Sequence, residues 1–392
     1  MNENILQQPI QEYINTHLNA DVNKIVLSKP IFEDVSAAEL AGQIAAKKKS
    51  IHKLPTWFNQ EGIYYPALIS IEQCSSEPTA AYKSNLMIGN NLIDLTAGFG
   101  VDSYFFSKKS TMVYSCELNP ELSSISAHNA KILNAEQIFC LALDGIEYLK
   151  SAPTTFDTVY IDPARRSNSN KVFMLKDCTP DVTAHLPLFL EKARRVIIKT
   201  APLLDITAGL NELKHVSEIH IVSVKNECKE LIWVIDKNYV SDPKIICATL
   251  NKQIKTFSFS ISDFQIKAKI ANDLPNGYLY EPDVALLKSG AFNLICEKFG
   301  LEKLHQQSHL YYSKEINTDF LGRIFEIKEV LSINELKKEK NLIGNVIVRN
   351  FPEKAEHLVS KYKIISDHDK FIIFTQITSG YIAVKAIIIQ HY

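Results

Sequence analysis

The stretch Leu92-Ile-Asp-Leu-Thr-Ala-Gly-Phe-Gly-Val-Asp102 decides the fold class. An apolar run ends in Asp94 and is followed by a loop with Gly98 and Gly100, where a ligand can approach the backbone because no Cβ stands in its way. The dinucleotide-binding fingerprint needs a third glycine three positions further on, and this chain has Ser103 there. An acid at the strand end also suits a cationic ligand better than a pyrophosphate. The stretch therefore predicts a strand, a ligand-binding loop and a helix.

Short apolar runs alternate with polar helical segments from Asn91 to about Asp236. The runs are NLIDL, TMVYSCEL, QIFCLAL, FDTVYID, RRVIIKT, EIHIVSV and ELIWVID. Runs of this length between turn residues are typical of strands in a mostly parallel sheet. Only a short polar segment beginning at Lys225 separates the last two runs, which is too short for a parallel crossover. The pattern predicts a Rossmann-like, doubly wound, mostly parallel seven-stranded sheet with an antiparallel final hairpin.

Acidic residues close four successive strands of this predicted sheet. Glu117 ends the second strand and lies 19 residues after Gly98, close to the ~20-residue spacing at which an acid meets ribose hydroxyls. Asp144 follows the third strand, where it can accept from an exocyclic adenine amine, and Asp162 ends the fourth. Any one of these acids is more simply interpreted as a helix cap. Four in order predict a ligand-binding crevice at the carboxyl edge of the sheet.

Composition and charge limit the classes of function. Lys+Arg 43 against Asp+Glu 44 gives a net charge of −1, which excludes a whole-surface electrostatic grip on nucleic acid but allows a local basic patch. The polar start predicts no signal peptide, and no apolar run approaches the ~18 residues needed to cross a bilayer. The seven cysteines are scattered without a CxxC pair, and the eleven histidines lack ligand spacing. We expect a cytoplasmic protein with reduced thiols and no metal or membrane.

The flanking regions differ from the central one. Ser36 and Glu39 form a capping-box pattern before an Ala-rich run, which predicts a helix, and a second helix is expected from Glu77. The last seventy or so residues read strand, helix, strand, strand, which predicts a small α+β module. The expected divisions are 1–85 (N-terminal helical region), 86–237 (Rossmann-like domain), 238–277 (connecting strands), 278–320 (small segment) and 321–392 (α+β module).

The ordered acids and glycines resemble those of class I S-adenosylmethionine-dependent methyltransferases. More closely, the chain resembles a bacterial branch of that superfamily with a C-terminal THUMP-like domain. The matching stretches are EQCSSEPTA (72–80), DLTAGFGVDS (94–103), DPARR (162–166), NECKE (226–230) and YEPDVALLKSGAF (280–292). The resemblance covers nearly the whole chain from about Lys24. It implies S-adenosyl-L-methionine as cofactor, a ferredoxin-like 278–320, a THUMP-like 321–392, and RNA, commonly structured tRNA or rRNA, as the substrate.

The resemblance also implies roles for individual residues. The residues expected around the methionine part of the cofactor are Asp94, Thr96, Gly98 and Gly100, with Asp94 near its amino group. Glu117 would accept both ribose hydroxyls, with Asn119 beside it. Asp144 would contact the adenine amine, and Gly145 would give room for the ring.

Asp162, Pro163 and Arg165 are the expected catalytic residues, facing the acceptor. Amino-methylating relatives have Asp/Asn-Pro-Pro-aromatic at this point, whereas this chain has Ala164 and Arg165 after the first proline. The missing aromatic removes a stacking surface for a flipped base, although a guanidinium can stack on a base or pair with phosphate. The expected reaction is direct in-line transfer, which depends on alignment in a water-poor pocket and needs no metal.

Other marked residues have two interpretations. The cations Arg165, Arg166, Lys171 and Lys199 form either salt bridges to the nearby acids or a rim for phosphate. Residues 47–53 with the aromatics that follow are better explained as a solvated helix end than as a nucleic-acid contact. Cys178 could act as a nucleophile, but a small buried side chain is the simpler interpretation. A polar turn is likewise the simpler interpretation of Asn226–Glu230.

Three alternative functions stay open at this point. A methyltransferase for a protein or a small metabolite fits the balanced charge and the missing aromatic. A non-catalytic RNA-binding protein would keep the fold only, and the intact Asp94, Gly98, Gly100 and Glu117 argue against it. A nicotinamide dehydrogenase is disfavoured by Ser103 at the third glycine position.

Overall fold

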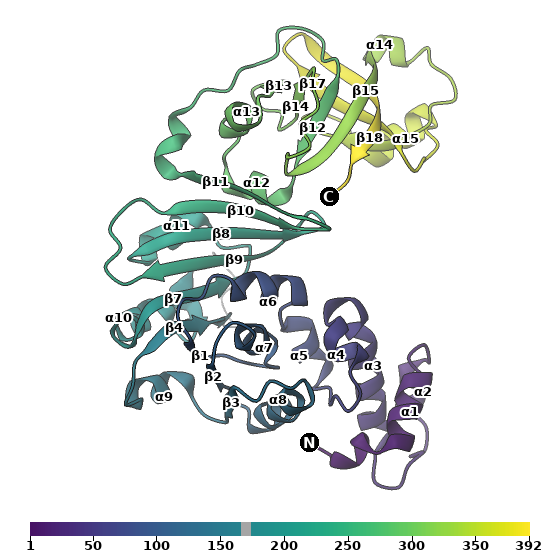
Figure 1. Cartoon of the computed structure of the whole chain (residues 1–392). Coiled ribbons are helices and arrows are strands. Elements are labelled where there is room, and N and C mark those ends of the chain that lie inside the picture. The colour runs from purple at the N-terminus through teal and green to yellow at the C-terminus, as the bar shows by residue number, and fades with distance from the viewer. Residues whose placement is uncertain (166–173) are drawn as a thin grey trace. The chain divides into compact units, whose positions relative to one another are not determined.

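The computed structural model describes residues 1–165 and 174–392, and it describes Arg165 by its backbone alone. The chain forms two compact units (Figure 1). The first unit consists of Met1–Ser217 and Leu231–Ser241, and the second of Glu218–Glu230 and Asp242–Tyr392.

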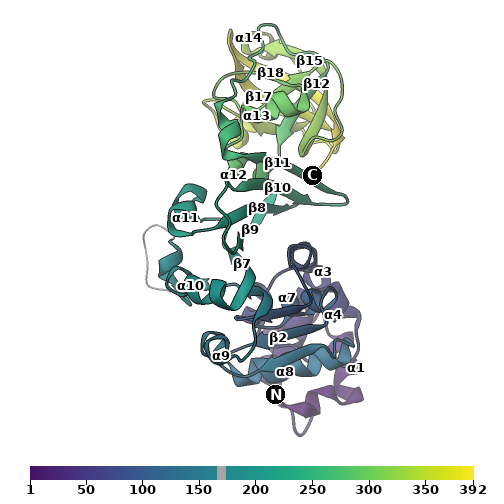
Figure 2. The ribbon, with the colours of Figure 1, turned by 60° about the vertical axis from the view of Figure 1, so that its left-hand side comes forward.

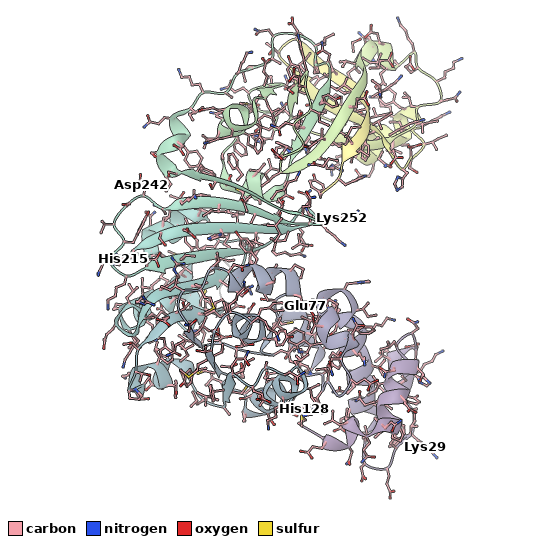
Figure 3. The ribbon with its side chains drawn as sticks, in the orientation of Figure 1. Lys29, Glu77, His128, His215, Asp242 and Lys252 are labelled. Atoms are coloured by element: carbon pink, nitrogen blue, oxygen red, sulfur yellow. The ribbon has the colours of Figure 1, made fainter. Side chains whose placement is uncertain are left out.

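Helices occupy the start of the first unit, before its first strand. They are η1 (Glu3–Leu6), α1 (Gln8–Thr16), α2 (Val22–Val26), α3 (Ala37–Lys53), α4 (Pro55–Asn59), α5 (Leu68–Gln73) and α6 (Glu77–Ser84). The predicted capping box is confirmed, since Glu39 N donates to Ser36 Oγ at 3.2 Å and Ser36 N donates to Glu39 Oε2 at 2.9 Å. Glu77, labelled in Figure 3, accepts from Thr56 N at 2.6 Å and thereby ties α6 to α4. The predicted N-terminal helical region is therefore present.

The sheet of the first unit has the strand order β9-β7-β4-β1-β2-β3. Its strands are β1 (Asn91–Asp94), β2 (Met112–Cys116), β3 (Ile138–Leu141), β4 (Phe156–Ile161), β7 (Ala193–Thr200) and β9 (Glu227–Asp236). Neighbours pair in parallel from β7 to β3, and β9 is antiparallel to β7. The seventh predicted strand, β8 (Val216–Val224), is also present. These findings confirm the predicted Rossmann-like, mostly parallel sheet, although within the described residues the sheet has nine strands rather than the predicted seven.

Helices follow the strands of this sheet in alternation along the chain. They are α7 (Val101–Ser107), α8 (Pro120–Ile132), α9 (Gly145–Ser151), α10 (Val182–Lys192) and α11 (Ile206–Glu212), and all of them are labelled in Figure 2. A short hairpin of β5 (Ala164–Arg165) and β6 (Cys178–Thr179), with η2 (Leu175–Asp177) before β6, follows β4. Because β1 has β2 on one side and β4 on the other, the chain leaves β1 and β4 in opposite directions. A crevice is expected at the carboxyl ends of the strands at such a switch point.

The tip of the β8–β9 hairpin lies in the second unit. Lys225 and Asn226 have φ of 49° and 59°, as a two-residue type I′ turn requires. The predicted polar turn is confirmed at Asn226 alone, because Glu227–Glu230 belong to β9 and Glu230 is buried. Asn226 Oδ1 accepts from Val284 N at 2.8 Å, which gives this turn a structural role. The strands predicted to connect the domains are β10 (Lys244–Leu250), parallel to β8, and β11 (Ile254–Ser260), antiparallel to β10.

A second sheet, also in the second unit, has the order β13-β14-β12-β15-β18-β17-β16. The elements are η3 (Ile261–Gln265), β12 (Tyr278–Pro282), α12 (Val284–Ser289), α13 (Leu294–Phe299), β13 (Glu302–Lys303), β14 (Tyr311–Ser313), β15 (Gly322–Ser332), α14 (Ile333–Leu336), β16 (Asn345–Val348), α15 (Ala355–Tyr362), β17 (Lys370–Ile377) and β18 (Gly380–Gln390). The predicted order of strand, helix, strand, strand is confirmed by β16, α15, β17 and β18. Residues such as Phe325, Ile373 and Val384 form the core of this sheet.

All seven cysteines are free thiols, as expected. Within residues 1–165 and 174–392, no helix has the length and apolar character that a membrane crossing requires.

Candidate active site

A cavity of about 690 Å³ opens in the first unit where the parallel strands end. Residues that follow these strands line the cavity. Across the sheet, from β7 to β3, their order is Lys199, Asp162, Thr96, Glu117 and Asp144. From β7 to β3 there are four strand spacings of ~4.8 Å, or roughly 19 Å. Four of the predicted carboxylates thus leave neighbouring strands at one edge, and Asp162, Glu117 and Asp144 share one cavity.

Asp94 lies beneath the loop rather than on the cavity wall. Its Oδ1 accepts from Thr96 N at 3.1 Å and its Oδ2 from Ser103 Oγ at 2.7 Å, and the residue is 0% exposed. Ser103, which stands where a dinucleotide-binding site has its third glycine, therefore holds the Asp94 carboxyl group in place. Burial raises the pKa of Asp94 to about 8.

This pKa gives a testable dependence of stability on pH. An unfolded aspartate has a pKa of about 3.9, so between about pH 4 and pH 8 the folded state keeps a proton that the unfolded state releases. The contribution of Asp94 to the free energy of unfolding has its full value below that range. It is lost as pH rises through about 8, by at most ~1.4 kcal/mol per pH unit. Between pH 5 and pH 8, the free energy of unfolding measured in urea should therefore fall more steeply for the wild type than for Asp94→Asn. Parallel profiles would contradict a protonated Asp94.

The two glycines of the loop, Gly98 and Gly100, differ in whether they leave the backbone open to the cavity. Gly98 has a φ of 56°, and a Cβ built on it would meet nothing within 4 Å. Because Gly98 lines the cavity, its missing side chain leaves the backbone open to a ligand. Gly100 has a φ of 81° and begins α7, with Ser126 3.4 Å from its would-be Cβ. Gly100 shapes the loop without lining the cavity.

Glu117 is held by two backbone donors. Gly98 N donates to its Oε2 at 3.0 Å and Asn119 N donates to its Oε1 at 2.8 Å. Each carboxylate oxygen carries two lone pairs, so each can accept one further hydrogen bond. This arrangement fits a pair of neighbouring hydroxyl groups, as a ribose presents.

Asp144, Asn119 and Gly145 all have local structural roles. Asp144 Oδ1 accepts from Ile146 N at 2.8 Å and caps α9, while Asp144 itself lines the cavity. Asn119 Oδ1 caps α8 by accepting from Glu121 N at 3.0 Å, away from the wall. Gly145 lines the cavity, but a Cβ there would lie 2.6 Å from Leu95 O. The room that Gly145 provides is therefore taken up by the backbone of the β1 loop.

Asp162 and Lys199 form an ion pair at the other end of the row. Lys199 Nζ lies 2.5 Å from Asp162 Oδ2, and both residues line the cavity. Asp162 N donates to Thr96 Oγ1 at 2.7 Å, so the turn after β4 is fixed to the loop after β1. For Lys199 the salt-bridge interpretation of the sequence is confirmed.

Other predicted residues lie off the wall or outside the description. Pro163 is buried and does not line the cavity. The backbone of Arg165 pairs with Cys178 in the short hairpin, and Arg166 and Lys171 fall outside the described residues. Cys178 is 1% exposed and burial raises its thiol pKa to about 11, which confirms the simpler interpretation of an unreactive buried side chain.

Sequence reasoning missed two parts of the wall. Thr179, Pro180 and His185 line the cavity, and Thr179 pairs with Ala164 in the segment that follows Asp162. Ser70, Gln73, Cys74 and Ser75, from α5 and the segment after it, supply another wall. Of these residues, Gln73, Cys74 and Ser75 could have been found from the sequence, because they belong to the 72–80 stretch that matches the resembled family.

A buried polar cluster fastens that second wall. Asp102 Oδ2 accepts from Ser75 Oγ and from Tyr160 OH, each at 2.8 Å. Lys83 Nζ lies 3.2 Å from Asp102 Oδ1 and is 0% exposed. The N-terminal region and the sheet are thereby joined beside the cavity, since these residues come from α6, α7 and β4. His128, labelled in Figure 3, adds a contact of α8 with Gly62 O at 2.8 Å.

The polar groups on the wall of the cavity fit a nucleoside better than a metal ion. The wall carries five carboxylates, those of Asp102, Glu117, Asp144, Glu147 and Asp162. Glu117 is also backed by two N–H groups, and such a wall suits hydroxyl, amine and cationic groups. In the part of the chain that is described, no group of three His, Cys, Asp or Glu could hold a metal ion. The open surface at Gly98 is the place where a ligand can lie against the backbone.

Comparisons with known proteins agree with this geometry. Residues 278–320 match a family model of a ferredoxin-like domain, and residues 322–389 match one described as THUMP domain-like. An uncharacterised S-adenosylmethionine-dependent methyltransferase of Mycobacterium tuberculosis is 22% identical over 323 residues, covering 79% of this chain and 84% of the relative. An uncharacterised RNA methyltransferase of Mycoplasma mobile is 22% identical over 257 residues, covering 62% and 65%.

A solved structure extends the likeness to the whole chain. The crystal structure of a candidate methyltransferase from Porphyromonas gingivalis W83 is 29% identical, covers 99% of each chain and has a TM-score of 0.87. The chain thus has homologues among S-adenosylmethionine-dependent methyltransferases and carries a THUMP-like C-terminal domain. The resemblance found in the sequence, with its enzyme class and cofactor, is confirmed.

Proposed function

We propose that this methyltransferase acts on structured RNA, tRNA or rRNA, by direct in-line transfer of the methyl group of S-adenosylmethionine. The observation that carries the catalytic part is the single cavity at the ends of β1, β2, β3, β4 and β7. Its row of side chains separates a cofactor end, with Glu117 and Asp144, from an acceptor end, with Asp162 and Lys199.

Three wall residues are proposed to hold the cofactor. Glu117 accepts the two ribose hydroxyls with the lone pairs left after Gly98 N and Asn119 N are satisfied. Asp144 accepts from the adenine amine, and Gly98 gives the methionine part access to the backbone. Asp94 supports this site from below by fixing Thr96 N. When bound, S-adenosylmethionine supplies an electrophilic methyl group on a sulfonium.

Asp162 is proposed to orient the acceptor and take its proton. Its position is fixed twice, by Lys199 on its carboxylate and by Thr96 on its backbone N–H. Such fixed alignment is what an in-line transfer needs. The walls from α5, Pro180 and His185 reduce the access of water to the reacting groups.

The RNA part of the proposal is supported by the second unit. The THUMP-like match covers residues 322–389, and a relative is described as an RNA methyltransferase. In this unit a hollow of about 530 Å³ has Arg323 and Arg349 as its charged lining residues. Both arginines pair with one buried carboxylate, that of Glu281, so the cluster keeps an excess positive charge.

We expect binding to total tRNA or rRNA that weakens steeply as salt rises from 50 to 200 mM, because phosphate contacts release counterions. Arg349→Ala should weaken this binding about 3- to 10-fold and reduce the salt slope by about one. Lys328→Ala, which removes a cation of the same module that does not line the hollow, is the matched control. Filter binding measures both.

The same samples distinguish the alternative functions. Calorimetry with S-adenosylhomocysteine reports the cofactor site without RNA. Cofactor binding with no salt-sensitive RNA binding would replace RNA by a protein or small metabolite as substrate. RNA binding with no cofactor heat would favour a non-catalytic protein.

A further inference from the structure

We infer that the methyl acceptor is a ring N–H next to a carbonyl, the lactam edge that guanine and uracil present, and that Lys199 is a specificity-determining residue for it. This inference rests on the proposed function and names its substrate class. The observation behind it is the ion pair of Asp162 and Lys199 on the wall of the cavity at its acceptor end.

The two side chains are presented together by the sheet. β4 and β7 are parallel neighbours, with Ile161 opposite Ile198, so Asp162 and Lys199 follow at the next position of each strand. Their charged atoms lie 2.5 Å apart, and the side chains are 28% and 16% exposed. The Asp162 backbone is also tied to Thr96. The acceptor therefore meets a carboxylate and an ammonium in a fixed arrangement.

A lactam edge is complementary to this pair. Its N–H donates to the carboxylate of Asp162, and its adjacent C=O accepts from the ammonium of Lys199. The ring nitrogen is a poor nucleophile while its lone pair is delocalised into the carbonyl. When the N–H proton moves to Asp162, the negative charge that develops on the carbonyl oxygen is stabilised by Lys199.

The transfer balances with these groups alone. The nitrogen lone pair forms the N–CH₃ bond, the S–CH₃ bond breaks with its electron pair left on sulfur, and the ring N–H proton stays on Asp162. The products are the N-methylated lactam and S-adenosylhomocysteine. No oxidant or further reactant is needed.

The sign of the charge argues against amine acceptors. Attack by an exocyclic or alkyl amine builds positive charge on its nitrogen, and a cation beside the carboxylate opposes that charge. A cationic lysine or arginine of a substrate protein would also meet Lys199 as a like charge. Attack by a lactam nitrogen builds negative charge instead, which Lys199 favours. This agrees with the absence of the Pro-aromatic sequence after Pro163.

The test is the identity of the methylated nucleoside. The full-length enzyme and isotopically labelled S-adenosylmethionine are incubated with total RNA from cells that lack this gene, and the RNA is digested for mass spectrometry. Labelled N1-methylguanosine or N3-methyluridine is expected. A label on an exocyclic amine, a ring carbon or a ribose hydroxyl overturns the lactam inference and leaves the RNA methyltransferase standing. Absence of label in any RNA overturns both.

The role of Lys199 is tested by its pH profile. Lys199→Gln should lower kcat about 100-fold at pH 7 and recover part of it at pH 9, because the variant must lose the lactam proton without help from a cation. Lys199→Arg should restore most of the activity. Affinity for S-adenosylhomocysteine, measured by calorimetry, should stay within about threefold in both variants. A Lys199→Gln loss that is equal at all pH values would overturn this role.

Discussion

Asp162→Ala should abolish methyl transfer while the affinity for S-adenosylhomocysteine stays within about twofold of the wild type. The substitution removes the carboxylate that orients the acceptor and takes its proton, and general base catalysis contributes about 10²- to 10⁴-fold to a rate. The loop after β1 should keep its place, because the bond to Thr96 Oγ1 comes from the backbone N–H of residue 162. Single-turnover transfer to RNA and calorimetry measure the two quantities separately.

The alanine variant leaves Lys199 without its carboxylate partner in a part-buried position, so a second variant is needed. Asp162→Asn keeps the shape and can still accept a hydrogen bond, but it cannot take a proton at neutral pH. We expect it to bind cofactor normally and to lose at least about 100-fold in single-turnover rate. Transfer at wild-type rate by Asp162→Asn would reject the proton-accepting role, and weakened cofactor binding in both variants would move Asp162 to the cofactor site.

The row of strand-end acids could be predicted because short apolar runs reveal parallel strands. Once the strands are known, parallel pairing brings every residue after a strand to the same edge. This rule predicts one edge for Glu117, Asp144 and Asp162, and they share one cavity. For Asp94 the strand pattern predicts the position in the chain but not the burial beneath the loop. That burial depends on a hydrogen bond from the hydroxyl of Ser103, and a strand pattern does not show which side chains form such a bond.

The parts that the sequence did not predict depend on long-range packing. His185 lies within α10, and its helical pattern does not show which face meets the cavity. The Lys83–Asp102 pair joins residues from α6 and α7, and a buried charge of either sign looks like a surface residue in sequence. The parallel pairing of β10 with β8 was missed for a similar reason, because a strand's neighbour is set by the fold rather than by its own residues.

Glu117→Ala should weaken S-adenosylhomocysteine binding by about 3 kcal/mol or more, which is over 100-fold in Kd. Two hydrogen bonds from ribose hydroxyls to a charged acceptor are lost, each worth ~1.5–3 kcal/mol. The variant also frees Gly98 N and Asn119 N, which the carboxylate holds at 3.0 and 2.8 Å. Part of the loss therefore comes from a loop that is less well ordered before binding.

Two comparisons separate these contributions. Glu121→Ala removes an exposed acid four residues further along the chain, outside the cavity, and should leave Kd within about twofold of the wild type. S-adenosylhomocysteine is the ligand in these measurements because it lacks the sulfonium charge. The loss of a nearby negative charge by itself therefore has little effect on its binding. Glu117→Gln keeps one amide oxygen as an acceptor and should lie between wild type and alanine. Calorimetry gives Kd for all four proteins, and thermal unfolding without ligand shows whether the loop has been disturbed. An unchanged Kd in Glu117→Ala would remove the ribose assignment, because no other carboxylate follows β2 within the described part of the wall.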